Sequence, residues 1–68
     1  MDKKEILIEF IAQDVVTKIA QKKSMEIPEA MNRLYSSVIF DKLLDYETGL
    51  YLEGTDYIYD LLTEELED

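Results

Sequence analysis

The chain lacks cysteine, histidine and tryptophan altogether, and its 68 residues include one proline and two glycines. Without cysteine or histidine there is no thiol nucleophile, no imidazole base, no disulfide framework and no ordinary zinc or haem ligand set. We therefore expect no metal site and no cofactor. A chain this short also has little room for a substrate cleft beside a core, so we expect that it is not an enzyme.

Basic residues are scarce too: seven Lys and Arg stand against sixteen Asp and Glu, for a formal net charge of −9. Nucleic-acid affinity comes mostly from Lys and Arg that neutralise phosphates, so the composition argues against a nucleic-acid partner. No apolar run approaches the ~20 residues of a membrane span. Glu9 and Asp14 interrupt the first apolar stretch, which argues against a secretory signal. We expect a cytoplasmic protein that does not bind membranes.

The short length makes burial of hydrophobic side chains demanding. Ordering the chain costs roughly 1.5 kcal/mol per residue, whereas apolar burial contributes about 25 cal/mol per Å². With 47% hydrophobic residues, nearly every one must be buried to stabilise the fold. Monomers of this size seldom achieve that, so we expect self-association or a tight protein partner.

Residues 5–22 contain neither glycine nor proline and predict a helix. Its apolar side chains form two stripes instead of one, which indicates contact from more than one direction, or contact with a second copy. The first stripe is Ile6, Leu7, Phe10 and Ile11, and the second is Ala12, Val15, Val16 and Ile19.

A second helix is expected to begin near Pro28, which suits a first helical turn. The apolar residues that follow have the i, i+3, i+4, i+7 spacing of one helical face: Met31, Leu34, Tyr35 and Val38. Ser36 and Ser37 favour capping of a third helix over residues 38–44, or the second helix runs through with a bend. Both alternatives remain open on sequence alone.

Residues 45–54 contain both glycines and predict a loop or a short extended segment, because residues 50–53 alternate in polarity. Thr55 is then expected to be the N-cap of a terminal amphipathic helix. The fold class is therefore all-α, a small bundle of three to four helices, in a single domain over residues 1–68.

Charge and tyrosine are unevenly distributed. Residues 1–42 hold seven acidic and seven basic residues, whereas residues 43–68 hold nine acidic residues and no basic one, so the whole charge of −9 lies after Lys42. Four of the five tyrosines lie there as well. The acidic half is either a solvated face that keeps the protein soluble or a binding surface for a basic partner, since tyrosine is common at interfaces and charge of one sign speeds encounter. The candidate partner-binding residues are Tyr46, Tyr51, Asp56, Tyr57, Tyr59, Asp60 and Glu64.

Asp14 is a candidate structural residue. It lies within helical reach of Leu7 and Phe10, where a charge is costly unless it is paired. We expect it to accept a hydrogen bond from a tyrosine hydroxyl, to cap a neighbouring helix, or to pair with Arg33.

Three segments combine aliphatic and acidic side chains: IEFIAQD at residues 8–14, FDKLLDYETGLY at 40–51 and EGTDYIY at 53–59. In these segments the chain resembles a family of short uncharacterised bacterial proteins, small acidic helical domains of unknown function. The resemblance implies a cytoplasmic helical domain with no assigned activity or site residues. Because some comparable families are encoded beside toxin-like genes, it also suggests an antitoxin-like or accessory role.

Two functions from different classes follow. The first is a protein-interaction module that uses the acidic, tyrosine-rich C-terminal half. The second is a structural or regulatory homo-oligomer with no foreign partner, in which the first helix packs against another copy.

Overall fold

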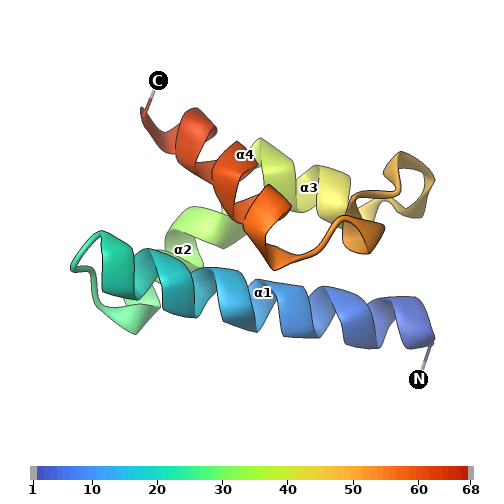
Figure 1. Cartoon of the computed structure of the whole chain (residues 1–68), viewed down its shortest axis with the longest axis horizontal. Helices are drawn as coiled ribbons and strands as arrows, with labels where there is room; N and C mark the ends of the chain where they lie inside the picture. Colours follow the sequence, from blue (N-terminus) through green and yellow to red (C-terminus); the bar gives the residue numbers. More distant parts are fainter. Residues whose placement is uncertain (1, 68) are drawn as a thin grey trace.

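The computed structural model describes residues 2–67 of the chain, and in that range it contains four α-helices, two 3₁₀ turns and no strand. The elements in chain order are α1 (Lys3–Lys22), α2 (Ile27–Tyr35), α3 (Val38–Leu44), η1 (Tyr46–Thr48), η2 (Leu50–Leu52) and α4 (Thr55–Glu67). The all-α prediction is therefore confirmed (Figure 1).

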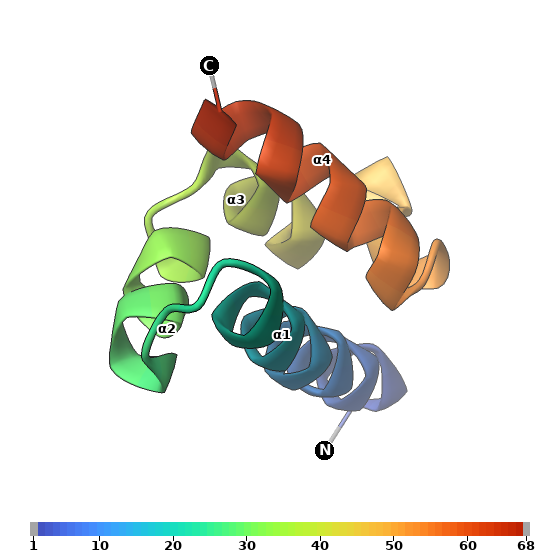
Figure 2. The same ribbon diagram turned by 60° about the vertical axis from the view of Figure 1, so that its left-hand side comes forward.

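The long helix α1 organises the bundle. Its 20 residues correspond to about 30 Å of helix, which matches the 32 Å long axis of the molecule. Figure 1 shows α3 and α4 together above α1, and Figure 2 shows α2 beside α1. The contact from more than one direction that the sequence indicates for this helix is thus made within the chain.

The hydrophobic core forms where these four helices meet. Its buried residues are Ile8, Ile11, Ala12, Val15, Val16, Ile19, Ala30, Leu34, Ile39, Leu43, Ile58 and Leu62. The first predicted stripe of α1 is only partly used, because Leu7 and Phe10 remain 42% and 60% exposed. On the predicted face of the second helix, Leu34 is buried, whereas Met31 and Tyr35 are exposed. Val38, which is also exposed, belongs to α3 and not to this helix.

Local signals explain where α1 begins and ends. The carboxylate of Asp2 accepts a hydrogen bond from the Lys4 N–H and caps α1. At the other end Ser24 adopts a left-handed conformation with φ 53°, and the Met25 N–H donates to the carbonyl of Ala20. This is the backbone pattern of a Schellman cap, in which glycine is the usual left-handed residue.

Ser37 separates α2 from α3. The residue is 3% exposed, and its hydroxyl accepts from the Phe40 N–H at 3.0 Å and donates to the Leu34 carbonyl at 2.6 Å. One side chain therefore caps the start of α3 and holds the end of α2. Of the two alternatives that the sequence left open, the structure adopts a fresh third helix.

The 45–54 segment forms the turns η1 and η2 instead of an extended strand. Gly49, with φ 70°, lies between the two turns in the left-handed region that favours glycine. Leu50 and Tyr51 pack against the core, and an isolated extended segment would have no neighbouring strand to pair with among residues 2–67. Of the two alternatives predicted for residues 45–54, the structure adopts the loop, built from two 3₁₀ turns, and not the short extended segment.

Thr55 is the first residue of α4 and not its N-cap. Gly54, with φ 89°, precedes it, and the Gly54 carbonyl accepts from the Ile58 N–H. The Thr55 hydroxyl turns instead towards α1. Among the helices of residues 2–67, none combines the length and hydropathy needed to cross a membrane.

Candidate functional site

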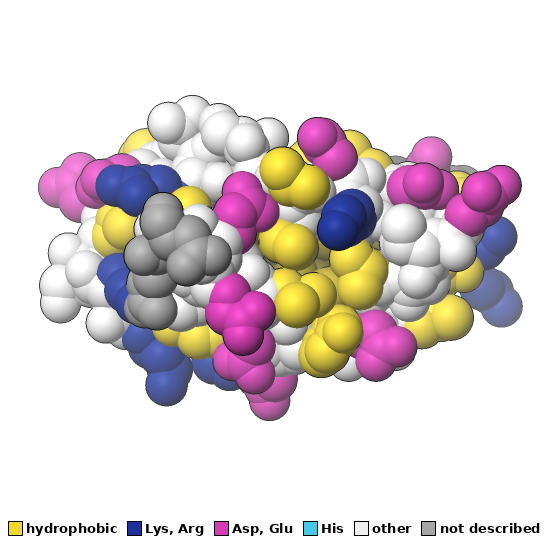
Figure 3. All heavy atoms as spheres, turned by 90° about the horizontal axis from the view of Figure 1, so that it is seen from above, with side chains coloured by type: hydrophobic (Ala, Val, Ile, Leu, Met, Phe, Trp, Pro, Cys, Tyr) yellow, Lys and Arg dark blue, Asp and Glu magenta, His cyan; other side chains and the backbone are white. Residues whose placement is uncertain are grey.

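The outer face of α4 carries four of the candidate residues that the sequence singled out. Asp56, Tyr57, Asp60 and Glu64 are all exposed, and their i, i+1, i+4, i+8 spacing places them opposite the buried Ile58 and Leu62. Viewed from above, the molecule shows a cluster of hydrophobic side chains with acidic side chains on either side and a basic side chain beside it (Figure 3). We call the four residues the outer face of α4.

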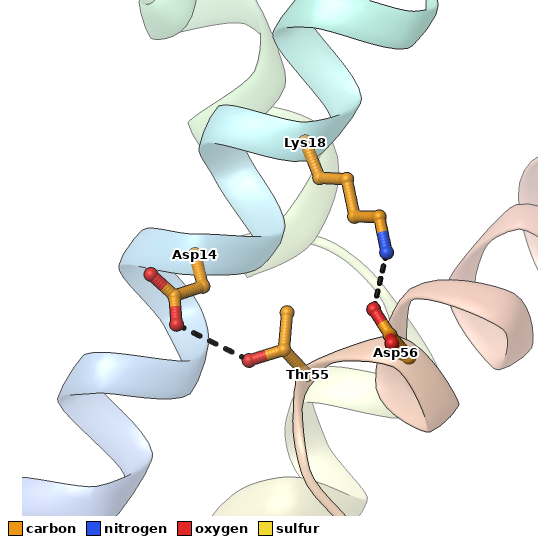
Figure 4. Close-up of polar contacts among 4 residues, drawn as sticks. All are labelled: Asp14, Lys18, Thr55 and Asp56. Atoms are coloured by element: carbon orange, nitrogen blue, oxygen red, sulfur yellow. Dashed lines mark hydrogen bonds and ion pairs between the residues drawn. The ribbon is translucent and has the colours of Figure 1, made fainter.

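Asp56 is held by an ion pair with Lys18 of α1 (Figure 4). The hydrogen bond from Lys18, followed by its positive charge, holds the pKa of Asp56 below its usual range. The same hydrogen bond raises the pKa of Lys18, with a smaller contribution from the charge of Asp60. Asp56 therefore joins two helices, whereas Asp60 and Glu64 carry charge on the same face without an ion pair among residues 2–67.

Asp14 lies beside this ion pair, at the point where α4 begins (Figure 4). Its carboxylate accepts a hydrogen bond from the Thr55 hydroxyl at 3.3 Å, and the side chain is exposed. A carboxylate near the N-terminus of a helix is favourable because the helix dipole is positive there. Arg33 is not its partner, because Arg33 lies 3.7 Å from Glu29 within α2.

Three of the four candidate tyrosines make contacts inside the molecule. The rings of Tyr46 and Tyr51 meet edge to face with centroids 5.8 Å apart, and Lys4 Nζ lies 5.0 Å from the Tyr46 ring. Tyr59 packs against the core, and Lys18 Nζ lies 5.1 Å from its ring. Tyr57 is 46% exposed on the outer face of α4. The structure therefore divides the candidate set, with Tyr46 and Tyr51 at one end of the bundle and the remaining residues on α4.

Glu65 has a role that the sequence gave no sign of. Its two carboxylate oxygens accept from the Val38 and Ile39 N–H groups at 3.1 and 3.2 Å. These N–H groups begin α3 and have no partner within that helix. Glu65 therefore caps α3 from α4, across a sequence separation that no local pattern reveals.

A larger feature that sequence reasoning missed is an apolar groove between α1 on one side and α2 and α3 on the other. It consists of two hollows, of about 390 and 260 Å³, which share Ala12 and Tyr35. The larger hollow is lined by Glu5, Ile8, Glu9, Ala12, Tyr35, Phe40, Leu44 and Tyr46, and the smaller by Ala12, Gln13, Val16, Thr17, Ile27, Met31 and Tyr35. We call the two hollows together the α1–α2–α3 groove.

The walls of this groove are rich in exposed hydrophobic side chains. Ile27, Met31, Tyr35, Leu44 and Tyr46 are each between 36% and 50% exposed. The spacing of Ile27, Met31 and Tyr35, four residues apart, was the available sign of a shared face on α2. Their use as the wall of a groove depends on how α2 meets α1, which sequence spacing does not fix.

Ionisable groups lie at one end of the groove. Glu5 and Glu9 belong to its α1 wall, and neither forms an ion pair or a side-chain hydrogen bond among residues 2–67. Partial burial raises the pKa of the Tyr46 hydroxyl, and the negative charges of Glu5 and Asp2 raise it further. In the part of the chain that the structure describes, no group of three acidic side chains is placed to hold a metal ion.

Comparison with known proteins gives no match: no family model, no curated protein and no solved structure matches the chain. The resemblance to short bacterial proteins stays a prediction.

Proposed function

We propose that this chain is a non-enzymatic protein-interaction module that binds a basic protein partner through the α1–α2–α3 groove. The observation that carries the proposal is the cluster of half-exposed hydrophobic side chains along that groove. Contiguous exposed apolar surface is uncommon on a soluble monomer and marks sites of association. Most of the lining side chains are apolar, which also supports binding rather than catalysis.

The acidic half of the chain supports a basic partner. The net charge of the chain, −9, lies entirely after Lys42, and the outer face of α4 presents Asp60 and Glu64 to solvent. Charge of one sign steers an oppositely charged protein into encounter without supplying much of the final affinity. In this proposal the groove provides contact area and the acidic half provides steering. An antitoxin-like neutraliser of a basic protein in the cytoplasm is one form of such a module.

Affinity purification from the native host, followed by mass spectrometry, tests the proposal. We expect a stoichiometric foreign protein that is captured by the wild type and by Leu52→Glu, a control at an exposed residue of η2 outside the groove. The double variant Met31→Glu/Leu44→Glu should no longer capture this partner, because a charge in an apolar contact is costly. Asp60→Lys/Glu64→Lys should slow association and weaken its dependence on salt. Equal capture by wild type and groove variant would contradict the proposal.

A homo-oligomer is the second candidate, and one observation favours it. The groove is lined almost entirely by residues of the electrically neutral region 1–42, so two copies can meet there with their acidic halves apart. Light scattering over rising protein concentration distinguishes the two functions. A dimer that Met31→Glu/Leu44→Glu converts to monomer would favour this candidate over a foreign partner.

A further inference from the structure

The α1–α2–α3 groove has the length of a short helix. Its α1 wall runs from Glu5 to Thr17, which corresponds to about 18 Å, or slightly more than three turns of an α-helix. The opposite wall is formed by α2 and then by α3 and Tyr46. A partner helix laid between these walls would contact both hollows at once.

The lining of the groove matches the apolar stripe of an amphipathic helix. Met31 borders the smaller hollow with a flexible side chain, and Tyr35 borders both hollows with a rigid ring. Ala12 and Val16 are buried and form a floor of small side chains. Helices that bind in grooves insert apolar residues at i, i+3, i+4 and i+7 against walls of this kind.

Charge distinguishes the two walls. Glu5 and Glu9 lie one turn apart on α1, both exposed and both without an ion-pair partner among residues 2–67. The facing wall of the larger hollow consists of Tyr35, Phe40, Leu44 and Tyr46 and has no charged side chain. A bound helix would therefore meet acidic groups along one flank and apolar groups along the other.

We propose that the groove binds an amphipathic helix of a partner protein that carries Lys or Arg along the flank facing Glu5 and Glu9. The inference rests on the proposed function and adds to it the structure, chemistry and orientation of the bound segment. A second copy that docked by the same groove fits less well, because it would bring its own Glu5 and Glu9 to the interface and no Lys or Arg among residues 2–67 lines either hollow to pair with them.

Selection from a displayed peptide library tests this. The library contains 18-residue helical peptides whose apolar stripe varies among Leu, Ile, Met, Val and Phe, and whose two flanks vary between Lys and Glu. We expect the wild-type chain to enrich peptides with Lys on one flank. Glu5→Lys/Glu9→Lys should weaken a selected basic peptide roughly tenfold, because two exposed charge pairs change from attraction to repulsion.

A matched control separates a local effect from one of net charge. Asp60→Lys/Glu64→Lys changes the net charge by the same amount on the outer face of α4 and should weaken the same peptide less than about threefold, since long-range charge is screened. Circular dichroism confirms that each variant is folded. The affinities are measured by fluorescence anisotropy.

The outcomes separate this inference from the proposed function. Peptides that need the groove but show no preference for Lys on either flank, or an equal loss in the two charge-reversal variants, would overturn the inference and leave the groove as a binding site. If no selected peptide is lost on Met31→Glu/Leu44→Glu, both the inference and groove binding fail. A groove-dependent dimer in light scattering would replace the partner helix by a second copy and overturn the inference.

Discussion

Replacing Glu65 with alanine removes a cap that α3 receives from another helix. In the wild type the carboxylate accepts from two N–H groups at the start of α3, at 3.1 and 3.2 Å. Loss of a capping side chain costs about 1 kcal/mol in typical cases, and loss of a negative charge at a helix N-terminus adds roughly 0.3–1 kcal/mol. We therefore expect Glu65→Ala to lower the free energy of unfolding by about 1–2 kcal/mol.

Urea denaturation followed by far-UV circular dichroism measures this difference. A domain of 68 residues has a total stability of roughly 3–10 kcal/mol, so the expected loss is a large fraction of it. In thermal unfolding the corresponding fall in Tm is roughly 7–14 °C. Glu65→Gln should give an intermediate value, because the amide retains one acceptor oxygen for the two donors.

Glu64→Ala is the matched control for Glu65→Ala. Glu64 precedes Glu65 in α4, carries the same charge and is exposed, so its removal changes net charge and helix propensity equally. We expect a change within about 0.5 kcal/mol. Equal losses for the two alanine variants would refute the capping role of Glu65 and assign the effect to helix propensity or charge.

Three further substitutions test other contacts, each by urea denaturation. Ser37→Ala should cost about 1–2 kcal/mol, because the buried hydroxyl caps α3 and also bonds to the end of α2. Ser24→Gly should stabilise the fold by roughly 1 kcal/mol, because Ser24 has φ 53°. Asp56→Asn should lower the free energy of unfolding at pH 7, because it removes the ion pair with Lys18. Since Lys18 lowers the pKa of Asp56 in the folded state, the stabilisation by this ion pair is present above about pH 4 and is lost as pH falls through the lowered pKa.

Neighbouring residues supply the controls for these three substitutions. Ser36 is exposed and has φ −91°, so Ser36→Ala should leave stability nearly unchanged and Ser36→Gly should not increase it. Asp60→Asn removes the same charge as Asp56→Asn without breaking an ion pair and should show a weaker dependence on pH. If Ser24→Gly and Ser36→Gly both increased stability, the role of the left-handed conformation at Ser24 would be contradicted. If Asp56→Asn and Asp60→Asn gave the same dependence of stability on pH, the role of the ion pair would be contradicted.

The helices could be predicted from the sequence because their signals are local. The absence of glycine and proline over residues 5–22 predicts nearly the whole of α1, and Pro28 lies in the first turn of α2. Ser37 offered a cap, and the structure uses it. Each of these features depends on residues within one or two turns of each other, so spacing and side-chain chemistry are sufficient.

The remaining contacts depend on which helices meet. Thr55 was expected to cap its own helix, but its hydroxyl donates to Asp14, 41 positions earlier. Glu65 appeared as one of several acidic residues near the C-terminus, and its role as a cap arises because α4 lies against the start of α3. The groove also depends on which helices meet, since Tyr35 borders both hollows only when α2 and α3 are placed beside α1.

The hydrophobic side chains that the bundle leaves exposed connect its stability to the proposed function. For so short a chain to be stable, nearly every hydrophobic side chain should be buried, yet five lining the groove remain 36% to 50% exposed. A partner that covers them stabilises the folded state by RT ln(1 + [L]/Kd), or about 2.7 kcal/mol at a hundredfold excess over Kd. That gain is comparable with the roughly 3–10 kcal/mol expected of the whole domain. Substitutions in the groove should therefore affect the free domain little and the bound domain strongly, whereas substitutions in the core should destabilise both.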